Sequence, residues 1–234
     1  MQNQIITGIV GLWLGTCGHA MAQGMPGTVV ELYTSQGCSS CPPADDYLRE
    51  LAGQPGVIAL ALHVDYWDYI GWTDQFADPK YTNRQKAYAH AEGSNTIYTP
   101  QMIVAGVERV EGSNPEMVEG ALRRHQSAAR TVTLHLVRNG GSVVVTASAN
   151  PPLTEALHVQ LVRYHPSATV KIEYGENAGM VMEYANTVTS WSRVGDWSGP
   201  DDLQMALPVV GEDPVVVILQ ADGPGQIYAA SVLK

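Results

Sequence analysis

Cysteine, phenylalanine and charge are scarce in this sequence of 234 residues. It contains three cysteines, one phenylalanine and 15% charged residues, against 45% hydrophobic residues. A chain of this composition is not disordered and has enough apolar side chains for a substantial core. The formal net charge is -10 and no basic stripe is present, which argues against nucleic acid and anionic membranes as partners.

Apolar runs long enough to span a membrane are also missing. Ile5–Leu14 is too short, and Ala20–Ala22 has the A-x-A spacing of a signal-peptide cleavage site. We therefore expect residues 1–22 to be a signal peptide, although its start lacks Lys and Arg. The mature protein is then periplasmic or secreted and not integral to the membrane. The alternative is a lipoprotein signal with Cys17 lipidated, because the residues that end at Cys17 roughly match a lipobox.

Cleavage after Ala22 leaves two cysteines, Cys38 and Cys41, in one C-x-x-C motif. A β-branched apolar run, Thr28–Thr34, precedes the motif, and a segment with helical spacing, Pro43–Leu51, follows it. A C-x-x-C at a strand-to-helix junction is typical of a dithiol–disulfide centre. The free N–H groups and partial positive charge of a helix start favour a thiolate at Cys38, and Cys41 lies where it can resolve a mixed disulfide. The alternative is a structural staple, although so short a loop restricts the unfolded chain little.

Val57–Asp65 is a nearly continuous apolar run, typical of a parallel strand covered on both faces. His63 and Asp65 share one face at its carboxyl end, where ligands and reacting groups of such sheets gather. His63 is a candidate for shuttling a proton, stabilising the thiolate or holding a metal. Alternatively, the His–Asp pair fixes the loop beyond. Four aromatic residues nearby line either a groove for a polypeptide or the packed base of a loop: Tyr66, Trp67, Tyr69 and Trp72.

Helices and strands continue to alternate up to residue 128. A helix opened by Asp78-Pro79 and closed by Gly93 is followed by a strand entered through Thr99-Pro100, a short strand at 107–110 and a helix from Ser113. The order strand, C-x-x-C, helix, strand, helix, Pro-led strand, strand, helix resembles the thioredoxin fold. We therefore expect an α/β thioredoxin-like domain over residues 23–128.

After Ala129 no helical period appears. A hairpin is predicted from residues 131–137 and 142–147, joined by Asn139–Gly141. Six further strand candidates follow at 157–164, 169–174, 180–184, 203–207, 215–220 and 227–233. These predict an antiparallel, all-β sandwich-like domain over residues 129–234.

Three segments together resemble an exported bacterial family known as domain of unknown function 1223: Glu31–Asp45, His63–Asp68 and Tyr98–Met102. The resemblance extends from about Thr28 to the C-terminus. It implies a thioredoxin-like domain and export from a Gram-negative cell, but no substrate.

The resemblance also implies roles for single residues. Cys38 is then the nucleophile, Cys41 the resolving thiol and Pro100 a cis-proline facing them. Thr99, which precedes that proline, is expected to offer backbone groups to a bound peptide as an added strand. Glu31 lies near the position of a buried carboxylate in thioredoxins, but one residue further from the first cysteine.

The sequence thus predicts an exported thiol–disulfide oxidoreductase that acts on protein thiols or disulfides. A membrane redox protein is a further candidate partner, and neither a cofactor nor a metal is expected. The residues expected at its site are Cys38, Cys41 and Pro100, supported by Thr99, His63, Asp65 and Glu31. Two alternatives remain. One is copper or zinc binding by the two cysteines and His63, since thiolates and imidazole suit both ions. The other is a non-catalytic interaction module with a structural disulfide.

Overall fold

The computed structural model describes residues 22–234. Most of the predicted signal peptide, including Cys17, falls on residues 1–21 and so lies outside the described part of the chain. Within the described part, no helix combines the length and the apolar character that a membrane crossing needs.

Strands dominate the structure, with 44% strand and 19% helix. In chain order the elements are β1 (Met25–Pro26), β2 (Thr28–Thr34), α1 (Pro42–Ala52), β3 (Val57–His63), the 3-10 helix η1 (Asp68–Ile70), α2 (Pro79–Ala91), β4 (Gln101–Val104), β5 (Glu108–Glu111), α3 (Pro115–Ser127), β6 (Val132–Asn139), β7 (Ser142–Ala149), β8 (Leu157–Lys171), β9 (Val181–Trp197), β10 (Leu203–Pro208), β11 (Val215–Ala221) and β12 (Ile227–Leu233).

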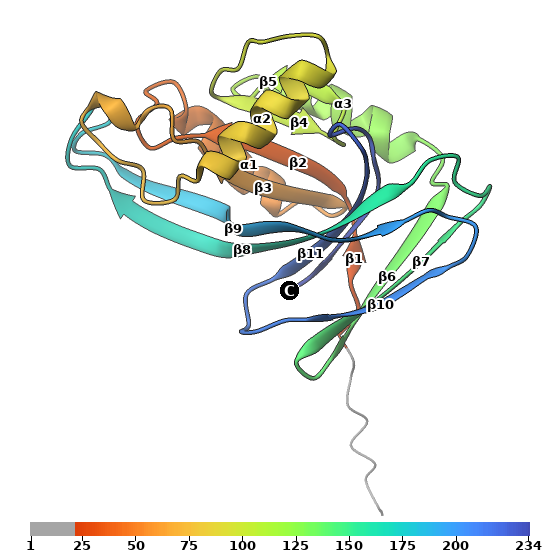
Figure 1. Ribbon diagram of the computed structural model, residues 1–234. Helices are drawn as coiled ribbons and strands as arrows, with labels where there is room; N and C mark the ends of the chain where they lie inside the picture. The colour runs from red at the N-terminus through yellow and green to blue at the C-terminus, as the bar shows by residue number, and fades with distance from the viewer. Residues whose placement is uncertain (1–21) are drawn as a thin grey trace, which may run out of the picture.

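Most of the strands form one large curled sheet in the order β1-β12-β11-β8-β9-β3-β2-β4-β5 (Figure 1). β2 and β3 pair in parallel along their whole length, ending with Thr34 opposite His63. β9 joins β3, also in parallel, where Ala61 pairs with Thr187. Strands from the C-terminal half therefore extend the same sheet that carries the C-x-x-C turn.

The predicted fold class, an α/β thioredoxin-like domain followed by an all-β sandwich-like domain, is wrong. The chain is mostly β, and strands from both halves share the large sheet. The periodicity of apolar residues identifies strands but not the strands they pair with. The pairing of β9 with β3 therefore has no local signal in the sequence. In addition, the predicted strand 157–164 and the first half of the predicted strand 169–174 are parts of one strand, β8, which ends at Lys171. The middle of β8 is exposed and reads His165-Pro166-Ser167. A proline among polar residues normally marks the end of a strand, so the sequence predicted two strands here.

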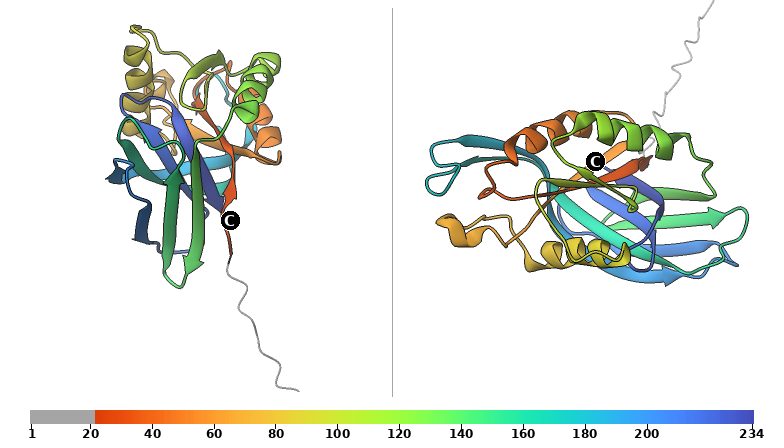
Figure 2. Two further views of the ribbon diagram at one scale, coloured as in Figure 1. Left: turned by 90° about the vertical axis from the view of Figure 1, so that its right-hand side faces the viewer. Right: turned by 90° about the horizontal axis from the view of Figure 1, so that it is seen from above.

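Helices cover both faces of the sheet around β2. α1 and α3 lie on one face and α2 on the other (Figure 2). The alternation of β2 follows these layers, because Val30 and Leu32 pack in the core beneath α1 and α3, whereas Val29 and Tyr33 pack in the core beneath α2. Elsewhere, the small sheet β10-β7-β6 packs over β8, β11 and β12 through a second apolar cluster.

The β8–β9 hairpin reaches the loops around the cysteine turn. Ile172 and Met182, near its tip, are buried against Trp72 and Phe76 of the loop that follows η1. This packing brings a segment from the C-terminal half of the chain to the residues that follow β3.

Local capping signals set the start of two helices. Asp78 accepts a hydrogen bond from the Lys80 amide (2.8 Å), and Asn114 accepts one from the Met117 amide (3.2 Å). Each cap precedes a proline at the first helical turn, which has no N–H to lose. α1 begins differently, since its N-cap is Cys41, whose side chain makes no capping hydrogen bond.

Candidate functional site

Cys38 and Cys41 form a disulfide in the turn between β2 and α1. The first two residues of α1, Pro42 and Pro43, have no N–H group. The next two amides both donate to the Cys41 carbonyl oxygen, at 2.9 and 3.1 Å. The helix start therefore brings the positive end of its dipole to the sulfur atoms, but it lacks the free N–H groups predicted from the sequence.

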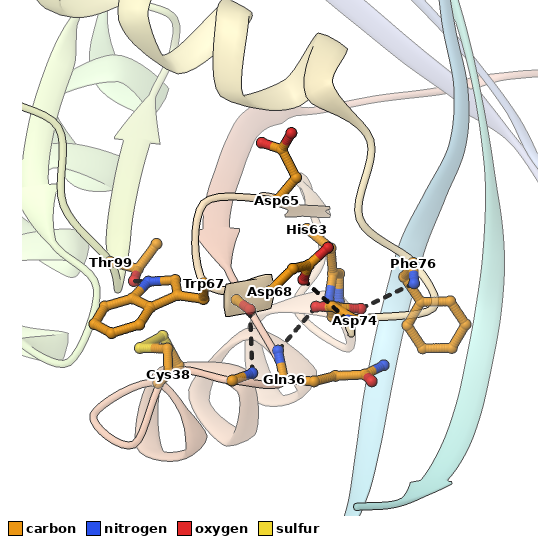
Figure 3. A network of polar contacts seen from close by, with 12 residues as sticks. Gln36, Cys38, His63, Asp65, Trp67, Asp68, Asp74, Phe76 and Thr99 are labelled. Atoms are coloured by element: carbon orange, nitrogen blue, oxygen red, sulfur yellow. Dashed lines mark hydrogen bonds and ion pairs between the residues drawn. A yellow bond between two sulfur atoms is a disulfide. The ribbon is translucent and has the colours of Figure 1, made fainter. Parts of the chain in front are cut away.

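A cover of two side chains, Trp67 and Thr99, lies over the disulfide, and both cysteines have an exposed fraction of 0%. The indole of Trp67 donates from Nε1 to Thr99 Oγ1 at 2.7 Å (Figure 3). Ser40 Oγ donates to the Thr99 carbonyl at 3.5 Å and lies 3.4 Å from Cys38 Sγ. The Thr99–Pro100 peptide bond is cis, in keeping with the resemblance. A partner thiol can meet Cys38 only after the cover moves.

Asn177, between β8 and β9, holds the backbone of the cysteine turn. Its Nδ2 donates to the carbonyl oxygens of Gln36 and Cys38, at 2.9 and 3.0 Å, and the residue is only 5% exposed. Trp72 Nε1 donates to Gln36 Oε1 at 2.8 Å. The turn is thus fixed by the hairpin tip and by the loop after η1.

His63 is fully buried at the end of β3, but its partner is not Asp65. His63 Nδ1 donates to Asp74 Oδ2 at 2.7 Å, and the same oxygen accepts from the Gln36 amide at 2.8 Å (Figure 3). Asp65 instead accepts a hydrogen bond from Thr82 Oγ1 of α2 at 2.5 Å. His63 and Asp65 were expected to share a site, but they have different partners. The hydrogen bond of Asp65 fixes its loop to α2.

Asp45 is a second buried carboxyl near His63. Burial raises the pKa of Asp45 from 3.8 to about 7, although the charge of His63 and the nearby Thr34 hydroxyl lower it. Asp74 behaves in the opposite way: burial raises its pKa, but the charge and hydrogen bond of His63, with two backbone N–H groups, bring the pKa below 3.8. Near neutral pH the site thus contains one ionised carboxyl and one whose pKa lies close to the pH of its surroundings.

Glu31 lies on the other face of the sheet, beneath α2. Its carboxylate accepts from Nε and Nη2 of Arg84 at 2.7 and 2.8 Å, from the Tyr88 hydroxyl at 2.7 Å and from the Tyr33 hydroxyl at 2.9 Å. The Arg84 guanidinium also stacks on Trp191, 3.9 Å from the ring centre. These contacts tie α2 to the sheet and leave Glu31 no lone pair directed at the cysteines.

No group of three or more His, Cys, Asp or Glu side chains among residues 22–234 is arranged to hold a metal ion. A recess of about 410 Å³ lies elsewhere, between β12 and the segment that joins α3 to β6, with His125, Arg130 and His135 in its lining. Neither cysteine borders that recess.

Two residues at the site, Asp74 and Asn177, have no place among the residues predicted from the sequence. Asp74 lies between Trp72 and Phe76, and a carboxyl flanked by large aromatic residues is a signal for a buried, paired group. Asn177, in a glycine-rich segment, offers no such signal.

The comparisons with known proteins concern nearly the whole described chain. A family model described as "Protein of unknown function (DUF1223)" matches residues 29–220. The crystal structure of a protein from Agrobacterium tumefaciens is similar, with 33% identity and a TM-score of 0.77 over 88% of this chain and 93% of that chain. The structure of HBP35 of Porphyromonas gingivalis is 12% identical, with a TM-score of 0.63 over 89% of this chain and 74% of that chain, which is a likeness of fold alone. None of the curated proteins matches this chain.

Proposed function

The chain belongs to the family described as "Protein of unknown function (DUF1223)", and we propose that its Cys38–Cys41 pair is a redox-active centre that exchanges disulfides with protein thiols. The observation that carries this proposal is the position of the disulfide at the strand-to-helix turn, with Cys41 as the N-cap of α1. A disulfide that closes so short a loop restricts the unfolded chain little. The turn is also held without it, through the two hydrogen bonds of Asn177.

The exchange requires two displacements at sulfur. A partner thiolate attacks Cys38 Sγ once Trp67 has moved, the S–S bond breaks, and its electron pair leaves on Cys41 Sγ. A second partner thiolate then attacks the partner's sulfur in the mixed disulfide. The partner leaves oxidised and Cys38 is released as a thiolate. The reverse sequence reduces a partner disulfide.

The proposal includes export of the mature protein to the periplasm or the medium, after removal of residues 1–22. An oxidising compartment keeps such a disulfide formed. The partners are protein thiols or disulfides, and a membrane redox partner is the candidate that resets the pair after each exchange.

A trapping experiment tests the proposal. Reduced Cys41→Ser protein is mixed with a peptide disulfide, and the adduct is located by mass spectrometry. Cys38 should form a stable mixed disulfide, because no second thiol is present to resolve it, whereas the matched Cys38→Ser variant should form little adduct. Equal adducts at the two positions, or none in either variant, would sink the proposal.

The full burial of both cysteines favours one second function, a non-catalytic interaction module whose disulfide is structural. In that case folded Cys41→Ser protein forms no adduct with the peptide, and Trp67 and Thr99 are ordinary packing around a fixed turn.

A further inference from the structure

Three buried polar atoms lie unpaired beneath the disulfide. Thr34 Oγ1, Asp45 Oδ1 and His63 Nε2 have no hydrogen-bond partner among the described residues. Folded proteins pair nearly all such atoms, so several together call for a role. The exchange of disulfides proposed above uses none of them.

The three side chains are neighbours of one another and of Cys41. Thr34 and His63 are paired residues at the ends of β2 and β3. Asp45 lies four residues after Cys41 in chain order, and its amide donates to the Cys41 carbonyl at 3.1 Å. Side chains at this spacing share one face of a helix, with about 5–6 Å between their Cβ atoms. Asp45 therefore stands beside Cys41 and above the ends of the two strands.

The hydrogen bond to Asp74 determines which nitrogen of His63 is free. An ionised carboxylate only accepts, so His63 Nδ1 carries the proton donated to Asp74 Oδ2 at 2.7 Å. Nε2 is then the ring nitrogen without a partner. Asp74 thus fixes the orientation of the ring and leaves Nε2 unpaired.

We infer that Asp45, supported by His63, is the group that takes the proton from Cys41 and returns it during disulfide exchange. The inference rests on the proposed exchange function. When a mixed disulfide on Cys38 is resolved, the Asp45 carboxylate accepts the proton of the Cys41 thiol. Cys41 Sγ attacks Cys38 Sγ, and the bond from Cys38 to the partner breaks as the partner leaves as a thiolate. In the opposite direction, protonated Asp45 gives its proton to the departing Cys41 sulfur.

The charges around Asp45 suit this role. The groups that face it are His63 of β3, Thr34 of β2, Asp74 of the loop after η1, Asp46 of α1 and Tyr184 of β9. Burial is the largest influence and raises the pKa of Asp45 to about 7, with His63 and Thr34 lowering it and Asp74 and Asp46 raising it. A group that both accepts and donates protons works best when its pKa is near the working pH.

The test uses the reduced full-length protein and dithiobis(nitrobenzoate). This reagent releases one coloured thiolate when a protein thiol attacks it and a second when the resulting mixed disulfide is resolved. The first phase is attack by Cys38, and the second is resolution by Cys41. In the wild type, the second phase should accelerate with pH through a midpoint near 7. In Asp45→Asn it should be slower by about a hundredfold at pH 7 and lose that midpoint, while the first phase is unchanged. The matched control is Glu50→Gln, which removes an exposed carboxylate of the same helix.

The two phases separate the possible failures. Without a first phase in the wild type, the proposed function fails and the inference falls with it. A normal first phase with the same second-phase midpoint in Asp45→Asn overturns the inference alone. If Asp45→Asn does not fold, His63→Gln decides: loss of the imidazole should move the midpoint to higher pH, and an unmoved midpoint overturns the inference.

Discussion

The indole Nε1 of Trp67 donates a 2.7 Å hydrogen bond to Oγ1 of Thr99, above a disulfide whose two cysteines have no exposed surface. Trp67 follows β3 and Thr99 precedes β4, so the bond joins two loops over the cysteine turn. A partner thiol reaches Cys38 only when these loops separate. The strength of this contact should therefore control the rate of exchange.

Thr99→Val removes the hydroxyl and keeps the shape of the side chain. Loss of one hydrogen bond of about 0.5–1.5 kcal/mol should raise the population of the open cover, and with it the rate of reduction by glutathione, by about two- to tenfold. Trp67→Ala should accelerate reduction further. Thr96→Val, on the same loop but exposed, is the matched control. Unchanged rates in both Thr99→Val and Trp67→Ala would show that the cover does not limit access.

Asn177→Ala should loosen the cysteine turn from the hairpin. The substitution leaves the carbonyl oxygens of Gln36 and Cys38 without their donor at a buried site. We expect unfolding free energy to fall by about 2–3 kcal/mol and the disulfide to react faster with dithiothreitol. Chemical denaturation and a thiol-release assay measure the two effects. Glu176 is exposed on the same segment, so Glu176→Ala should change neither the stability nor the reaction rate. If Asn177→Ala is as stable as Glu176→Ala, then Asn177 does not hold the cysteine turn in place.

The elements next to the cysteines could be predicted from the sequence because their signals are local. The apolar run of β2, the C-x-x-C and the proline-led starts of α1 and α2 each fix structure within a few residues. The expected bounds of β2 agree with the structure, and those of α1 differ by one residue at each end.

The contacts that complete the site could not be predicted in this way. His63 was expected to act with Asp65, two positions away on the same strand face, yet the strand ends at His63 and Asp65 turns to Thr82. The partner of His63, Asp74, and the donor to Cys38, Asn177, come from loops brought in by tertiary packing. Pairing of β9 with β3 is equally non-local, which is why an independent sandwich was expected where the sheet in fact continues.

Asp45 should make stability depend on pH. Its pKa is raised from 3.8 to about 7 in the folded protein, mainly by burial. The folded state therefore holds more protons than the unfolded chain between these values, and stability falls as pH rises through them. Relative to Asp45→Asn, the wild type should lose about 2–3 kcal/mol of unfolding free energy between pH 5 and pH 8, with little further loss above.

Urea unfolding of both oxidised proteins across this pH range measures the difference. Glu50→Gln, which removes an exposed carboxylate of the same helix, should follow the wild type at every pH. A constant difference between the wild type and Asp45→Asn from pH 5 to pH 8 would mean that Asp45 ionises as freely in the folded protein as in the unfolded chain.

The reduction potential of the Cys38–Cys41 pair tests the central claim most directly. Oxidised protein is equilibrated with glutathione redox buffers at pH 7, and the free thiols are alkylated and counted by mass spectrometry. An active exchange centre predicts a potential above about -300 mV, with both cysteines reduced and reoxidised reversibly. A potential below about -300 mV is typical of a structural disulfide, and that result would contradict the assignment of this pair as a thiol–disulfide exchange centre.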